Sequence, residues 1–431
     1  MADSSVTHEV DRPPRILHPN FGVGAPPSKR WPAPWLFFFL VMPYGIVQGF
    51  VQTPLPVLLR QFGVTTGEIA TIVAFITLPT TLNFLWGPIV DFLLPRRTWM
   101  VLATAATAAL FFIGILQLHS HINLARWLLF LGFATCTMTS ACCGGLMAST
   151  LTSAEKGKAA GWYNAGSLGA SAVGGGVLLF FAERLPLIGV SLIAAAMLML
   201  MALPALTIKE APPQNSLRQL EESISGIWRE VRETVFHWKA VPSLLLILAP
   251  LGTGAAIPLF ASMAGEYRVT PSGVMLLNGF VGALLIVSGS LLATLIPSQW
   301  DRRLNYAFAG GINGLGSMAM VLLPMHASVY YVCVSLYFVT TGVAYTCFTA
   351  LVLHMLGTAG RSGSSRYTIL LSLANIPCVF MTWFEGVGYR HFGAKGVPGF
   401  DAAGNVAVCV VVIGLALFFR STSITPLGDV P

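Results

Sequence analysis

Twelve apolar runs follow one another along the chain, and they leave few folds open to it. Each has about the 20 residues that a helix needs to cross roughly 30 Å of hydrocarbon. A segment in lipid must also satisfy its backbone polar groups internally. The sequence therefore predicts an all-α polytopic membrane protein with twelve transmembrane helices. The runs lie near 33–58, 68–89, 99–118, 125–149, 159–181, 185–206, 241–262, 273–296, 306–324, 328–355, 368–389 and 402–419.

The charged residues are few and gather at the ends of these runs. They make up 10% of the chain, whereas a soluble domain carries about 25%. Eighteen of the 24 lysines and arginines fall on one side of the predicted membrane and six on the other, and the richer side is normally cytoplasmic. We therefore expect the plasma (inner) membrane, with both termini cytoplasmic. The net charge of +7 then reflects topology, not nucleic-acid binding.

Cysteines and catalytic motifs give no sign of metal or enzyme chemistry. All seven cysteines lie inside apolar runs, and no C-x-x-C, H-E-x-x-H or G-x-x-x-x-G-K-[ST] occurs. Soft-metal sites need clustered ligands at fixed spacing. We expect reduced core cysteines, and no metal, cofactor, catalytic residue or enzyme activity.

The polar stretch 209–240 divides the runs into six and six. Weak internal symmetry of this kind is typical of transporters whose two lobes rock about a central site. The halves match at three places, at offsets of 205 to 211 residues: Met42–Gly45 with Ala249–Gly252, the segments from Phe62 and Tyr267, and Asn164 with Asn375. We predict a disordered tail 1–30, a six-helix lobe 31–208, a linker 209–240, a six-helix lobe 241–420 and a tail 421–431, the two lobes being pseudo-symmetric.

The linker has a helical pattern of its own. From Ser216 to Trp238, apolar residues recur at steps of three and four, and charged residues cover the other face. The pattern predicts an amphipathic helix along the cytoplasmic surface that tethers the lobes. Binding of a partner protein by this helix is the alternative.

The segment LPTTLNFLWGPIVDFLLPRRTW, from Leu78 to Trp99, joins two of the runs and carries a G-x-x-x-D pattern followed by two arginines. It resembles the signature loop of the major facilitator superfamily. It is most similar to the branch of muropeptide permeases, acetyl-CoA transporters and siderophore permeases. The matching residues are Pro79, Leu82, Phe84, Leu85, Trp86, Pro88, Asp91, Arg96, Arg97 and Trp99.

Two departures from that branch concern coupling. Asn83 stands where the branch usually has a lysine, and the run 137–150 lacks the two acidic residues that the branch commonly carries there. Buried carboxylates are the usual proton carriers in membrane helices. The resemblance implies proton symport, but these positions lack the charged residues that would carry the proton. Protons are therefore only a candidate coupled ion.

Several polar residues inside the runs are candidates for lining a substrate cavity. Tyr44, Gln48 and Gln52 are spaced four apart and form one stripe on a helix. Polar groups facing lipid are costly, so the stripe faces either a cavity or neighbouring helices. The remaining cavity candidates are Thr77, Thr81, Asn164 and Asn375.

One acid, Glu385, lies clearly within a predicted run, and an intramembrane acid is a functional candidate. It is the candidate for ion coupling. Its position near the outer end of the run would also let it reach water or Arg390. The loop residues Gly87, Asp91, Arg96 and Arg97 form a predicted conformational latch, which stabilises the inner contact between helices when the cavity opens outward.

These features predict a secondary, non-ATP transporter that moves a small or medium-sized organic solute by alternating access. The resemblance implies a muropeptide-like solute or another metabolite. We expect a monomer in the lipid bilayer whose partners are that solute and lipid. The alternative is a non-transporting membrane scaffold or sensor of the same fold that acts through the surface helix.

Overall fold

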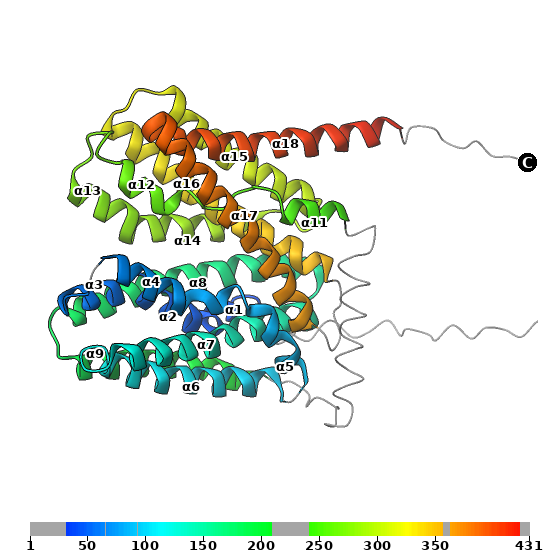
Figure 1. Ribbon diagram of the computed structural model, residues 1–431. Coiled ribbons are helices and arrows are strands. Elements are labelled where there is room, and N and C mark those ends of the chain that lie inside the picture. The colour runs from blue at the N-terminus through cyan, green and yellow to red at the C-terminus, as the bar shows by residue number, and fades with distance from the viewer. Residues whose placement is uncertain (1–31, 65, 93, 209–240, 357–362, 423–431) are drawn as a thin grey trace, which may run out of the picture.

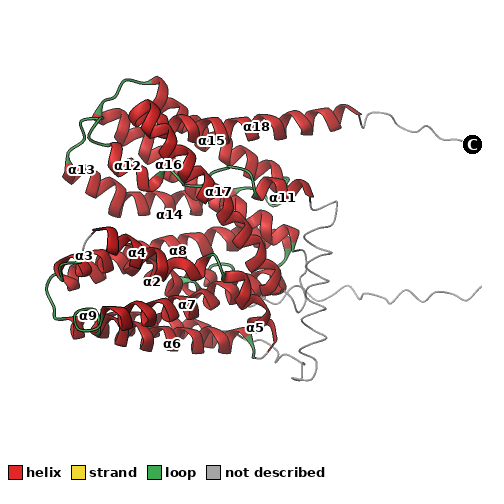
Figure 2. Cartoon of the chain, viewed as in Figure 1, coloured by secondary structure: helices red, strands yellow, loops and turns green. Residues whose placement is uncertain are grey.

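The computed structural model describes residues 32–64, 66–92, 94–208, 241–356 and 363–422. Its described elements are helices and their connections, with no strand (Figure 2). They form twelve spans, some of them divided into shorter helices. The predicted all-α, twelve-helix architecture is confirmed. The predicted linker helix, 216–238, lies outside the described residues.

The first lobe holds six of the spans. Its first span is broken at Val41 and Thr53, where prolines at the next helix starts remove backbone donors. The second span is interrupted by two 3₁₀ turns beside Pro79. The elements are α1 (Leu36–Leu40), α2 (Met42–Gln52), α3 (Pro54–Gln61), α4 (Thr66–Thr77), η1 (Leu78–Thr80), η2 (Asn83–Leu85), α5 (Trp86–Phe92), α6 (Arg96–Leu116), α7 (Ile122–Thr150), α8 (Ser153–Ala182), α9 (Leu187–Ala202) and η3 (Leu203–Thr207).

The second lobe repeats this order. Its first span is broken between α11 and α12, and its second contains the π-helical turn η5. The elements are α11 (Val241–Ile247), α12 (Ile257–Met263), α13 (Pro271–Leu276), η5 (Leu277–Val281), α14 (Gly282–Leu292), η6 (Ala293–Leu295), α15 (Arg302–Leu322), α16 (Ala327–Met355), α17 (Gly363–Phe392), η7 (Gly393–Lys395) and α18 (Gly396–Thr422).

Helix lengths show the internal repeat more clearly than the sequence does. Helices α6 and α15 each have 21 residues, and both begin with Arg-Arg. Helices α7 and α16 have 29 residues each, and α8 and α17 have 30 each. The third, fourth and fifth spans of the two lobes are therefore structural equivalents.

Seven described helical segments are long and apolar enough to cross a membrane, and the last of them runs from α17 into α18. Of the other spans, α15 is long enough at 21 residues but less apolar, and the rest are divided among shorter helices. Breaks of this kind are tolerated at membrane depth where the backbone is buried in protein or lines a cavity.

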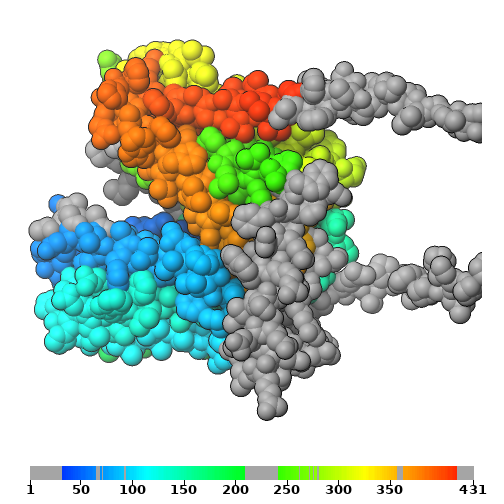
Figure 3. Space-filling view, turned by 45° about the vertical axis from the view of Figure 1, so that its right-hand side comes forward, coloured from blue at the N-terminus to red at the C-terminus, as the bar shows by residue number. Residues whose placement is uncertain are grey.

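The lobes pack together at one end of the molecule, where α6 and α15 begin; we call it the latch end (Figure 1). Each lobe has its own apolar core. A third apolar cluster lies at the latch end and contains residues of both lobes, including Leu146 of α7, Tyr163 of α8 and Leu353 of α16. At the opposite end the lobes part, as the space-filling view shows (Figure 3).

Candidate functional site

Asp91, near the end of α5, joins the two lobes at the latch end. Its carboxylate is fully buried and accepts four hydrogen bonds. Within its own lobe, Arg96 Nη2 donates at 2.8 Å. From the start of α17 in the other lobe, the backbone nitrogens of Ser364 and Ser365 donate at 3.2 and 2.8 Å, and Ser365 Oγ at 2.9 Å. A carboxylate is well placed there, because the first turn of a helix leaves its N–H groups unpaired and carries partial positive charge.

Arg96 extends this network. Its Nε donates to Ser364 Oγ at 3.1 Å and its Nη1 to Ser149 Oγ at 3.1 Å. Gly87 makes the close approach possible, because a Cβ at that position would collide with Ser365 Cα. Three of the four predicted latch residues therefore lie at one inter-lobe contact.

Arg97 is placed differently from the prediction. Its side chain is exposed, and its Nη1 donates to the carbonyl of Ile208 within the same lobe at 3.2 Å. Successive residues of a helix point about 100° apart. Arg96 and Arg97 therefore cannot both face the carboxylate of Asp91.

A second set of contacts joins α8 to α16. Asn164 Nδ2 lies 3.2 Å from the carbonyl of Tyr345 and 3.0 Å from Thr349 Oγ1. Nearer the latch end, Lys156 Nζ donates to the carbonyl of Leu353 at 3.2 Å. These bonds close the inter-lobe space on the latch side of the cavity described next.

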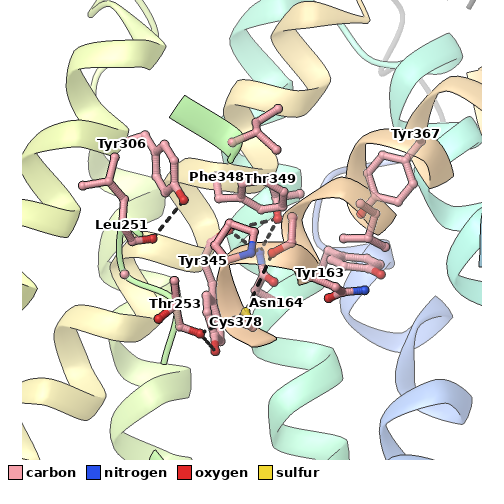
Figure 4. Close-up of a pocket in the computed structure, with 16 residues that line it drawn as sticks. Tyr163, Asn164, Leu251, Thr253, Tyr306, Tyr345, Phe348, Thr349, Tyr367 and Cys378 are labelled. Atoms are coloured by element: carbon pink, nitrogen blue, oxygen red, sulfur yellow. Dashed lines mark hydrogen bonds between the residues drawn. The ribbon is translucent and has the colours of Figure 1, made fainter. Parts of the chain in front are cut away.

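A cavity of about 200 Å³ lies between the lobes, on the open side of these contacts (Figure 4). Its wall is aromatic and neutral polar, and contains no charged side chain among the described residues. The lining consists of Tyr163, Asn164, Ile247, Leu251, Gly252, Thr253, Tyr306, Tyr345, Phe348, Thr349, Tyr367, Leu371, Ala374, Asn375, Pro377 and Cys378.

The unwound part of the seventh span, between α11 and α12, forms one wall of this cavity. Gly252 and Gly254 have φ angles of 53° and 69°, which residues with a Cβ rarely adopt. The freed backbone groups find partners on other helices. Tyr306 Oη donates to Leu251 O at 2.9 Å, and Tyr345 Oη to Thr253 O at 3.1 Å. Broken helices of this kind mark substrate sites in many transporters.

The predicted cavity residues divide into two groups. Asn164 and Asn375 line the cavity, and their helices, α8 and α17, are equivalents in the internal repeat. Tyr44 is not part of the lining but lies close to the cavity tyrosines Tyr163 and Tyr367.

The other four candidates do not line this cavity. Gln48 is half-buried and Gln52 is exposed. Thr77 and Thr81 donate their hydroxyls to carbonyls of their own turns, at 2.9 Å to Val73 O and 2.7 Å to Leu78 O. This local bonding is common for threonine in membrane helices.

Sequence reasoning missed the tyrosine Tyr306 and the backbone of Thr253. Aromatic residues in apolar runs are usually core, so nothing in the pattern singles out Tyr306. The glycines flanking Thr253 were a usable signal, because two of them within four residues of Pro250 weaken a helix.

Glu385 is completely buried, and neither of its carboxylate oxygens has a hydrogen-bond donor among the described residues. The prediction that it could reach water or Arg390 is therefore wrong. A second acid missed by the sequence, Asp401 of α18, is also completely buried and lies close enough to interact with it. Asp401 accepts from Ser317 Oγ at 2.6 Å and from Tyr337 Oη at 3.1 Å.

Comparison with known proteins identifies this architecture. A model of the Major Facilitator Superfamily matches residues 37–378. Among solved structures, the E. coli fucose:proton symporter FucP aligns with TM-score 0.65 and 14% identity over 91% of this chain and 99% of that one. The human organic anion transporter MFSD10 (TETRAN) aligns with TM-score 0.63 and 13% identity over 88% and 98%.

The proton:xylose symporter XylE, bound to 6-bromo-6-deoxy-D-glucose, aligns with TM-score 0.60 and 11% identity over 88% of this chain and 94% of that one. Such low identities show a shared fold alone. Curated protein sequences give no match.

Proposed function

Because the chain belongs to the major facilitator superfamily, we propose that it is a secondary transporter that moves a small organic solute across its membrane by alternating access. The observation that carries the proposal is the cavity between the lobes, closed on one side by bonds from Asp91 and Asn164 and reached from the other. A central site with access from one side at a time is what a rocking two-lobed transporter requires.

The conformation is outward-facing if the latch end is cytoplasmic. The excess of lysine and arginine on that side supports this orientation. The Asp91–Arg96 pair then has the role of a latch, holding the cytoplasmic ends of the lobes together while the cavity opens outward. Release of this contact would let the lobes rock to the inward-facing state.

The cavity wall favours an uncharged, hydroxylated solute of about the size of a sugar. Its described lining offers tyrosine and threonine hydroxyls and two asparagine amides beside aromatic rings, and no cation to pair with an anion. An anionic muropeptide or acyl-CoA would have to leave water without a counter-charge, which is costly. Aromatic faces combined with a few polar groups are typical of small-molecule sites.

The buried pair Glu385 and Asp401 is the proposed proton-coupling site. Two carboxylates this close cannot both carry a charge in a buried place without a large cost, and no cation is described beside them. Asp401 has two donors and is suited to stay ionised, whereas Glu385 has none and is suited to hold the proton.

The native Cys378 makes the transport proposal testable without a known substrate. It lines the cavity and is half-buried, whereas the other six cysteines are buried. We expect a membrane-impermeant maleimide to label Cys378 from the extracellular side. A bound solute should slow labelling about tenfold and raise the thermal unfolding midpoint.

The measurement is a screen of neutral sugars, muropeptides, acyl-CoA thioesters and siderophores, with Cys378→Ser as the unlabelled control. Protection by a neutral sugar-like solute, followed by its uptake into proteoliposomes, supports the proposal. Labelling from both sides at equal rates in the absence of solute would contradict alternating access.

A further inference from the structure

The latch end has two halves related by the internal repeat, and only one of them contains its own anion. Helices α6 and α15 correspond residue for residue, so Arg302 is the equivalent of Arg96. Both arginines are 8% exposed. Each lies against the start of a 30-residue helix of the other lobe: Arg96 against α17 and Arg302 against α8. Arg96 is neutralised by Asp91 at 2.8 Å.

Arg302 has no such partner. Its guanidinium lies against α8, where a Cβ at Gly157 would come 3.0 Å from Nη1. Its Nη2 is buried without a hydrogen-bond partner, and no carboxylate of the described residues lies within 4 Å of the group. The segment before it, 282–300, contains no acidic residue. Asp301 is exposed and accepts from the backbone nitrogen of Arg303 at 2.8 Å.

The surroundings of Arg302 add positive charge from both lobes. Lys156 and Lys158 come from α8, and Arg303 comes from α15. The ring of His354 in α16 is close enough to Arg302, Arg303 and Lys156 to be acted on by their charges, and the one acid that also acts on it is Asp301. Like charges facing one another across the lobes oppose closure of this end.

A hollow of about 380 Å³ opens beside Arg302 at this point. Ala154, Gly157 and Lys158 of α8 form one side of it, and Thr294, Ser298 and Gln299 form the other. In the adjoining pocket, Asn305 Nδ2 is a second buried donor without a partner. The site thus offers unpaired donors and basic side chains in a space large enough for a tetrahedral oxyanion.

We propose that a phosphate group binds in this hollow against Arg302 and completes a second latch between α8 and α15. It takes the place that the Asp91 carboxylate holds in the first latch. Guanidinium and phosphate match as bidentate partners, and the start of α8 adds the positive end of its dipole. By bridging the lobes, the phosphate favours the conformation in which the latch end is closed. The group comes either from a free phosphate compound or from a phospholipid headgroup.

The test follows both the thermal unfolding midpoint and the rate of Cys378 labelling from the open end. In detergent, sodium phosphate is compared with sodium chloride at equal ionic strength. In nanodiscs, phosphatidylglycerol is compared with phosphatidylcholine alone. We expect phosphate chemistry to raise the midpoint by about 3 °C and the labelling rate about fivefold. Arg302→Gln should abolish both responses.

Two further variants make the result decisive. Lys158→Gln, at the exposed rim of the hollow, should weaken both responses even if Arg302→Gln folds poorly. Arg184→Gln removes an exposed arginine at the opposite end of the molecule and should leave them unchanged. A response to phosphate in detergent identifies a soluble ligand, and a response to phosphatidylglycerol alone identifies a lipid headgroup.

Two outcomes would overturn the proposal. One is an equal response to phosphate in wild type and in both site variants. The other is a conformational defect of Arg302→Gln that is equally large without any phosphate, because the arginine would then act through a group of the chain itself. Neither outcome would affect the transport proposal, whose test depends on solute protection of Cys378.

Discussion

Replacing Asp91 by asparagine is expected to lower the rate of Cys378 labelling from the open end more than tenfold. The change removes the charge that Arg96 pairs with at 2.8 Å and leaves a buried guanidinium uncompensated. It also removes acceptors from the start of α17. Breaking a buried pair by removing one partner costs about 3 to 5 kcal/mol, and each 1.4 kcal/mol is about a tenfold change in an equilibrium.

The measurement is the initial rate of labelling in membrane vesicles of known orientation, from each side in turn. Labelling from the latch side should rise as labelling from the open side falls, because the population moves to the other state. Glu183→Gln is the matched control, since that acid sits 3.7 Å from Arg184 in a pair whose side chains are about half exposed. Exposed pairs contribute little. Equal rates in wild type and Asp91→Asn would refute the latch.

The membrane explains why so much of this fold was predictable. A span must be long, apolar and self-bonded, so hydropathy alone located all twelve spans. The loop from Leu78 to Trp99 also contains one side of the inter-lobe contact at Asp91. It could not name the other side, because Ser364 and Ser365 lie more than 270 residues away and carry no motif that pairs them with Asp91.

The site was less predictable, for three physical reasons. Thr77 and Thr81 looked like cavity residues, but a threonine in a helix can satisfy its hydroxyl on its own backbone. Asp401 fell just outside the last predicted run, 402–419, which began too late. The structure starts α18 at Gly396, and a proline in the first turn of a helix removes no bonded donor.

The third reason is that a broken helix changes what a polar group can do. Beyond the end of α11, the carbonyls of Leu251 and Thr253 are not bonded within a helix. They accept hydrogen bonds from tyrosines of α15 and α16 instead. A sequence pattern assigns those carbonyls to the helix and the tyrosines to the core. Only the fold shows that they meet at the wall of one cavity.

Replacing Glu385 by glutamine is expected to abolish proton-driven accumulation of solute while leaving exchange intact. A pH difference of one unit is worth about 1.4 kcal/mol per proton. Wild type that carries one proton with each neutral solute should therefore concentrate it about tenfold. Glutamine keeps the size and the neutral form of Glu385 but cannot release a proton, so the variant should only equilibrate its solute.

The measurement is uptake into proteoliposomes of the solute that protects Cys378, with and without a pH gradient, alongside exchange across loaded vesicles. Glu266→Gln is the control: it also replaces an acid of the second lobe, but Glu266 is exposed and accepts from Tyr389 Oη at 2.8 Å, away from Asp401. That variant should accumulate solute as wild type does.

If wild type itself only equilibrates the solute, the protein is a facilitator, and the buried acid pair serves another purpose. If Glu385→Gln accumulates solute fully, the proton is carried elsewhere. The variant lacks Glu385, the member of the pair suited to hold the proton, and keeps Asp401, which has two hydrogen-bond donors.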